Sequence, residues 1–198
     1  PSFVNHQIRN VVFHKDRLCL LADGNVAASE AQEYFNHWIT TATTTVDSDP
    51  LDLAGTGNRV AFLDWALPYN QQLTLFSARG GIVQELRGVD GVLTPKNATI
   101  VDRAAYANSP LVGPLADGRS IFFVQVRDTA SGVYEYQSTV LEVRSDEITA
   151  HLPSYIPGRI RLFKGSDNEQ TLVLIPEVDQ SAMYVYRFHY AGNDKVMS

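Results

Sequence analysis

Cysteine is almost absent from this chain, and long apolar runs are missing. The 198 residues include one cysteine, Cys19. A single thiol cannot form an internal disulfide, so the fold does not depend on an oxidising compartment. Because Cys19 stands in an apolar strand pattern, we expect a small buried side chain rather than a nucleophile. No window approaches the roughly 18 apolar residues of a membrane span, and we expect no signal peptide.

Positive charge is also scarce. The chain has 16 Lys and Arg residues against 22 Asp and Glu residues, which gives a net charge of −6. A general nucleic-acid-binding surface needs an excess of cations to replace counterions, so the composition argues against one. It does not exclude a channel for DNA, where weak repulsion helps the duplex to slide. The 44% hydrophobic content is typical of a packed globular core.

Motifs that carry chemistry are not found. The five histidines, at positions 6, 14, 37, 151 and 189, show no metal-ligand spacing, and no Gly-x-Ser-x-Gly elbow is present. Asp47-Ser48-Asp49 resembles the start of a calcium loop, but Pro50 and Leu51 follow where the ligand pattern should continue, so we interpret it as a solvated turn. We therefore predict no catalytic, cofactor-binding or metal-binding residues and no cofactor. Helix signals are limited to residues 29–35, which suit one short helix or turn.

What the sequence does contain is a two-strand pattern that occurs four times. A short apolar strand begins at Leu18, Leu73, Ile121 and Leu172, at intervals of roughly 50 residues. A second strand follows each one, at residues 25–28, 82–86, 133–136 and 184–187. Because the first strand of each pair is nearly all apolar, we expect it to be covered on both faces.

The repeat predicts an all-β fold. Strands before and after each pair complete a unit of four, with first strands at 10–13, 60–67, 111–115 and 159–163 and fourth strands at 51–53, 99–101 and 148–150. We predict a β-propeller, or part of one, with about four four-stranded blades. The blade-like units span residues 8–53, 59–102, 110–150 and 158–190 of a single domain, 1–198.

An aromatic stripe stands out near the end of the chain. Tyr184, Tyr186, Phe188 and Tyr190 alternate along one stretch. They could form a platform on which a sugar stacks. Packing of one strand face against a neighbouring strand is the commoner role of such a stripe.

Several segments together resemble one known family. They are RLCLLADGNV at 17–26, EYFNHW at 33–38, DPLD at 49–52, LFS at 75–77, LTPK at 93–96, GRSIFF at 118–123, ITAHLPSYI at 148–156, MYVY at 183–186 and GNDKVMS at 192–198. In this order they resemble tail tubular protein B, the nozzle protein of short-tailed bacteriophages.

The resemblance implies a structural protein of the virion, made in the bacterial host cytoplasm and placed in the phage tail. It implies a ring of copies, contacts with tail tubular protein A and tail fibres, and a channel through which DNA passes during ejection. Family members are several times longer, so we expect this chain to be a middle, propeller-containing part. Two alternatives stay open: a propeller module that binds a host glycan or a tail fibre, and a propeller hydrolase acting on polysaccharide.

Overall fold

The computed structural model describes all residues except 42, 58–59, 118, 140–141, 167, 192–193 and 198, and the side chains of 190–197 are outside the description. The described residues form strands, turns and loops, without a helix. The chain divides into two compact units, Pro1–Ala107 and Asn108–Ser198. The all-β prediction is therefore confirmed.

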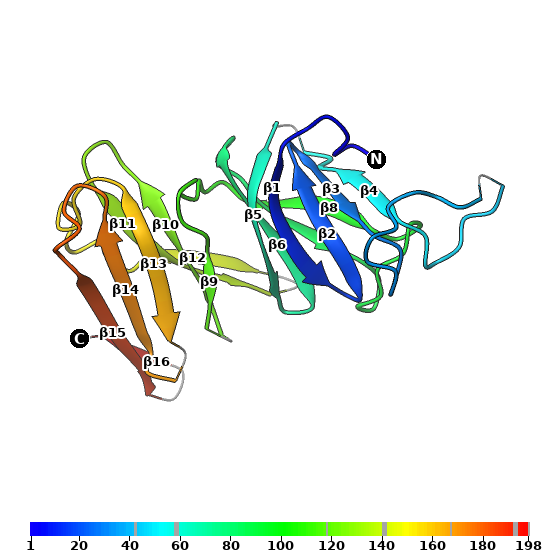
Figure 1. The fold of residues 1–198 in the computed structure, drawn as a ribbon. Coiled ribbons are helices and arrows are strands. Elements are labelled where there is room, and N and C mark those ends of the chain that lie inside the picture. The colour runs from blue at the N-terminus through cyan, green and yellow to red at the C-terminus, as the bar shows by residue number, and fades with distance from the viewer. Residues whose placement is uncertain are drawn as a thin grey trace. The chain divides into compact units, whose positions relative to one another are not determined.

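The first unit contains two four-stranded antiparallel sheets (Figure 1). The first sheet consists of β1 (Ile8–His14), β2 (Arg17–Ala22), β3 (Asn25–Ala28) and β4 (Leu51–Ala54). The second consists of β5 (Phe62–Tyr69), β6 (Gln72–Arg79), β7 (Val83–Arg87) and β8 (Thr99–Ala104). In each sheet the strands pair in chain order, and β5 contacts β1 and β2 across the gap between the sheets.

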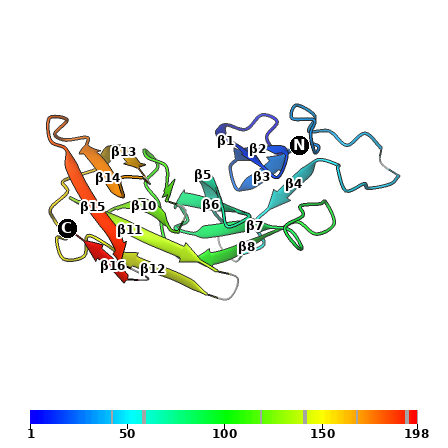
Figure 2. The same cartoon turned by 90° about the horizontal axis from the view of Figure 1, so that it is seen from below.

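The second unit repeats this plan with two more sheets (Figure 2). Its first sheet consists of β9 (Leu115–Ala116), β10 (Ile121–Val126), β11 (Ser131–Ser138) and β12 (Val143–Glu147). Its second consists of β13 (Ile160–Ser166), β14 (Thr171–Pro176), β15 (Tyr184–Ala191) and β16 (Asp194–Met197). These are also antiparallel meanders in which consecutive strands pair.

Two tight hairpins set the register in the first unit. Lys15 and Asp16 are the two loop residues between β1 and β2, and Asn70 and Gln71 stand between β5 and β6. All four have positive φ, between 45° and 63°. Two such residues in succession are the signature of a type I′ turn, whose twist matches that of the flanking strands.

Each unit has an apolar core between its own sheets. In the first, Cys19, Leu21 and Val26 pack with residues of the second sheet such as Leu73 and Leu75. Cys19 is fully buried, as predicted. Burial raises the pKa of its thiol to about 12, against a smaller opposing effect of Arg17, so the thiolate is scarce at neutral pH.

The second core draws on both sheets in the same way. Phe122, Val124 and Val133 come from the sheet β9–β12, and Leu172 and Phe188 come from the sheet β13–β16. Phe122 and Phe188 are in ring contact, with their centroids 5.3 Å apart. Each sheet therefore buries an apolar face against its neighbour in the same unit.

The prediction that four strands are covered on both faces is confirmed for three of them. In β2, β6 and β10 successive apolar residues are buried. It is wrong for β14, where buried Leu172 and Leu174 alternate with partly exposed Val173 and Ile175. A strand with one covered face alternates in this way, so apolar composition alone overestimated its burial.

Three further predictions need correction. The strand expected at 111–115 is limited to Leu115–Ala116, because Pro110 and Pro114 remove backbone donors in the segment before it. The strand expected at 148–150 is a turn, and pairing with β11 is made instead by the charged strand β12. Residues 29–35 form turns and an isolated bridge rather than a helix, and β16 was not predicted.

Candidate functional site

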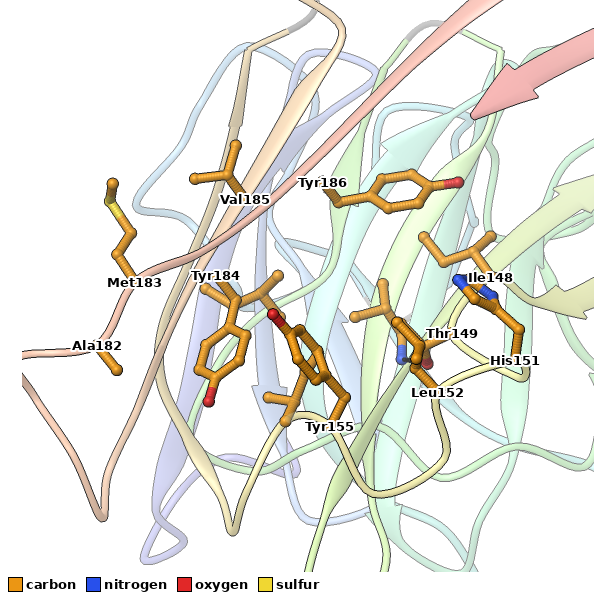
Figure 3. Close-up of a pocket in the computed structure, with 13 residues that line it drawn as sticks. Ile148, Thr149, His151, Leu152, Tyr155, Ala182, Met183, Tyr184, Val185 and Tyr186 are labelled. Carbon is orange, nitrogen blue, oxygen red and sulfur yellow. Dashed lines mark hydrogen bonds between the residues drawn. The ribbon is translucent and has the colours of Figure 1, made fainter. Parts of the chain in front are cut away.

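The second unit contains a pocket of about 750 Å³ (Figure 3). Its walls come from β11, β14, the segment 148–156 and the beginning of β15. The lining residues are Val133, Ile148, Thr149, His151, Leu152, Tyr155, Ile156, Leu174, Ala182, Met183, Tyr184, Val185 and Tyr186. Val133 and Leu174 belong to the buried core, so the pocket opens directly onto the apolar interior of this unit.

One wall is a loop that β11 holds in place. The Ile148 amide donates to the Val133 carbonyl (3.0 Å), and the Val133 amide donates to the Thr149 hydroxyl (3.0 Å). At the other end of the loop, the Ser131 amide donates to the Ile156 carbonyl (2.9 Å). The Ser131 hydroxyl donates to the carbonyl of Gly158 (2.6 Å). The loop that carries His151, Leu152 and Tyr155 is thus fixed at both ends.

The other wall is the start of the aromatic stripe. Tyr184 and Tyr186 face the core side of β15, and Phe188 is almost fully buried behind them. The ring of Tyr155 meets that of Tyr184 edge-to-face, with centroids 5.2 Å apart, and Figure 3 shows the two rings lying together. The packing role predicted for the stripe is confirmed for Phe188, whereas the two tyrosines also line the pocket; Tyr190 lies outside the described side chains.

The chemistry of the lining is apolar and uncharged. Among the described lining residues there is no Asp, Glu, Lys, Arg, Asn or Gln. The polar groups are the Thr149 hydroxyl, the His151 imidazole and the tyrosine hydroxyls. Such a lining offers no pair of carboxylates for glycoside hydrolysis and no cations for phosphates. The lining suits contact with an apolar ligand.

Sequence reasoning missed a buried side chain of the first unit that makes several hydrogen bonds. Arg17, 1% exposed, donates through its guanidinium to five backbone carbonyls, four from the long β3–β4 connection and one from the β7–β8 connection. The acceptors are Ser29 (2.7 Å), Ser48 (3.2 Å), Asp49 (2.8 Å), Asp47 (2.8 Å) and Leu93 (3.4 Å). Burial lowers the pKa of Arg17, and interactions with Cys19, Glu30 and Asp49 oppose this shift.

The Asp47-Ser48-Asp49 segment therefore has a structural role. Its carbonyls all accept from Arg17, and Asp49 is buried and accepts from the Val46 amide (2.9 Å). The prediction of a solvated turn was wrong for Asp49. The buried carbonyl acceptors explain why an arginine, with donors in a planar fork, stands at position 17.

Other charged residues form ion pairs within each unit. Glu85, almost fully buried, pairs with Arg87 (2.6 Å) and Arg103 (3.1 Å). In the second unit Arg127 pairs with Glu147 and donates to the Tyr134 hydroxyl (2.8 Å), and both contacts raise its pKa. Across the described parts of the chain, no three His, Cys, Asp or Glu residues are grouped so that they could hold a metal ion. Nor do the described residues include a helix long and apolar enough to cross a membrane.

Comparison with known proteins identifies a family, a relative from a phage and solved structures, among them one of low similarity. The tail tubular protein gp12 of Escherichia phage T7 is 28% identical over 197 residues, or 98% of this chain, and the chain spans 24% of the length of that relative. A solved structure from Bacteroides uniformis, described as a 6-phosphogluconolactonase, covers 95% of this chain and 68% of its own at 12% identity, with a TM-score of 0.41, which supports no conclusion. The family model of the bacteriophage nozzle protein matches residues 1–198. This chain belongs to the bacteriophage nozzle protein family.

Proposed function

We propose that this chain is a structural part of the short tail of a bacteriophage, where it contributes to the nozzle through which the genome leaves the particle. The match of the family model to residues 1–198 carries this proposal. The relative from phage T7 bears the name of a tail tubular protein, which agrees with it. On this basis the chain is made in the host cytoplasm and resides in the virion.

The four sheets suit the wall of a conduit. In each, consecutive strands pair antiparallel and satisfy one another's backbone groups. We propose that the sheets are blades of a β-propeller-type domain; the antiparallel order β1 to β4, repeated in the other three sheets, supports this. The single domain expected for residues 1–198 stays a prediction.

The net charge suits passage rather than retention of DNA. At −6 the chain repels phosphates weakly, so a duplex moving past it is not held by counterion release. In this role the chain needs no enzymatic activity and no cofactor. The partners we propose are copies of itself in a ring, tail tubular protein A and the tail fibre.

Labelling of intact virions tests the proposal. A peptide tag in the Asp90–Gly91 turn, where Asp90 is exposed, is built into the phage gene and allows detection by a gold-conjugated antibody fragment in electron micrographs. We expect label at the distal end of the tail, and none on untagged virions. Label on the capsid or along the fibres would contradict a nozzle position. The absence of label on intact virions that contain the tagged chain would also contradict it.

The enzymatic alternative has its own test. The purified chain incubated with host capsular polysaccharide is expected to release no oligosaccharide. Release that disappears when one named Asp or Glu is replaced by its amide would establish a hydrolase instead.

A further inference from the structure

We propose that the pocket between the 148–156 loop and β15 is a docking site for a short, uncharged, apolar peptide segment of a second protein. The segment inserts aromatic or aliphatic side chains against the tyrosines of the pocket. The chemistry of the ligand follows from the pocket. Only its source, another tail protein, rests on the proposed function.

The lining selects against charged and highly hydroxylated ligands. A glycan that leaves water must have partners for its many hydroxyl groups, and buried hydroxyls without partners cost free energy. Among its side chains, the described lining provides only the Thr149 hydroxyl, the His151 imidazole and the tyrosine hydroxyls for this purpose. A nucleic acid would need cations, which the described lining does not contain. An uncharged apolar segment requires neither.

The rim shows that apolar surface stays in contact with solvent at this site. Leu152, Tyr155 and Met183 line the pocket and are exposed. Figure 3 shows Leu152 and Tyr155 on the loop and Met183 on the segment that leads into β15. Exposed apolar side chains gathered around a hollow are typical of a protein-binding site. Their burial by a ligand supplies the driving force for docking.

The pocket is formed before any ligand arrives. Hydrogen bonds to β11 fix its loop at both ends, and its floor, Val133 and Leu174, is part of the core. Tyrosine side chains give rigid contact area at low entropy cost, while Met183 can adapt to the shape of the ligand. A volume of about 750 Å³ lies within the usual range for ligand sites, so it admits a short segment rather than a folded surface.

Two leucines provide a matched pair of variants. Leu152 on the rim is 44% exposed, and Leu111, in the same unit but outside the lining, is 46% exposed. Leu152→Arg places a charge at the opening of an uncharged pocket, whereas Leu111→Arg adds the same charge elsewhere. Tyr155→Ser removes a ring from the rim and serves as the second variant if Leu152→Arg does not fold.

Nuclear magnetic resonance of the methionine methyl groups gives a local signal. The chain has two methionines, Met183 in the lining and Met197 in β16. The probes are an acetylated, amidated Gly-Phe-Pro-Leu-Gly peptide, the same peptide with Ser in place of Phe and Leu, maltohexaose and a short DNA duplex, each up to about 1 mM, the weak end of specific affinity. We expect only the apolar peptide to shift the Met183 signal, with saturation.

The variants and the remaining probes decide the outcome. Leu152→Arg or Tyr155→Ser should weaken apolar-peptide binding at least about tenfold, while Leu111→Arg leaves it unchanged. A saturating shift with the glycan or the duplex would overturn the ligand class. So would equal binding of the apolar peptide to the rim variants and the unchanged chain, or the absence of a saturating shift with any probe. Overlapping peptides of the other tail proteins test the source. If none binds while the model peptide does, the assignment to a tail protein falls, whatever the position of the nozzle label.

Discussion

Arg17 connects segments of the first unit that are far apart in the sequence. Its guanidinium donates to carbonyls of the β3–β4 connection and to the Leu93 carbonyl in the β7–β8 connection of the other sheet. We expect Arg17→Met to lower the free energy of unfolding of the chain by about 3–5 kcal/mol, because buried carbonyls lose their donors. Urea denaturation followed by tryptophan fluorescence measures this loss.

Arg144→Met is the matched control. The Arg144 side chain is 76% exposed and pairs with Asp146 on β12, and such a surface ion pair contributes about 0–1 kcal/mol. If both variants lost the same small amount of stability, Arg17 would not hold the two connections together.

His14 gives a prediction for the pH dependence of stability. It is buried at the end of β1, and burial followed by repulsion from Lys15 lowers its pKa from 6.5 to about 4. Between these values the unfolded chain binds more protons than the folded one, so stability rises with pH. The contribution is complete above about pH 6.5 and is lost as the pH falls to about 4, on the order of 3 kcal/mol.

His14→Gln isolates this contribution from the carboxylates that titrate nearby. The difference in unfolding free energy between the variant and the unchanged chain should change steadily from pH 6.5 down to pH 4 and be constant above pH 7. A difference that does not vary with pH would show that His14 titrates alike in the folded and unfolded chains.

At the level of single elements, β14 separates a covered face from an open one. Leu174 is 1% exposed in the core, whereas Val185, which stands opposite Val173 of β14 on the other face, is 50% exposed. Leu174→Ala should lower the free energy of unfolding by about 2–5 kcal/mol through lost burial and the cavity left behind.

Val185→Ala removes apolar atoms from the open face and should cost less than about 1 kcal/mol. Thermal and urea unfolding of both variants measures the contrast. A loss below about 0.5 kcal/mol for Leu174→Ala would place β14 at the periphery of the unit.

Element positions were predictable where the pattern is local. Apolar runs located β2, β6, β10 and β14, because the apolar pattern of a strand is carried by neighbouring residues. β12 was displaced in the prediction because its sequence, Val143–Glu147, is mostly polar and has the form of an edge strand.

At the scale of the whole molecule, we expect a chain that is largely monomeric in solution. The two cores lie within the chain, the net charge of −6 gives mutual repulsion, and a stable interface needs about 1,200–2,000 Å² of buried surface. Light scattering on the purified chain should give a mass near 21.9 kDa.

Two other outcomes of this measurement are informative. A discrete hexameric ring would refute the monomer and place the ring-forming surface within residues 1–198. Polydisperse aggregates would also refute it and would indicate association through exposed apolar side chains such as Phe35 and Trp38.

The candidate site was only partly predictable. The stripe from Tyr184 to Phe188 was visible in the sequence, but its role as a pocket wall depends on Tyr155 and Leu152, which are about 30 residues earlier in the chain. The predicted absence of catalytic and metal-binding residues stays a prediction. Arg17 looked like an ordinary cation before an apolar strand, because its five acceptors are backbone carbonyls, which leave no pattern in side-chain types.

The sequence by itself determined the all-β class, the fourfold repeat and the resemblance to the nozzle family, because these depend on composition and on the order of local apolar patterns along the chain. Tertiary structure decided which faces are covered, where Arg17 finds its acceptors and where the pocket lies. Those features depend on contacts between residues far apart in the chain, as between β11 and the loop that it fixes. Local sequence patterns do not specify which distant residues meet.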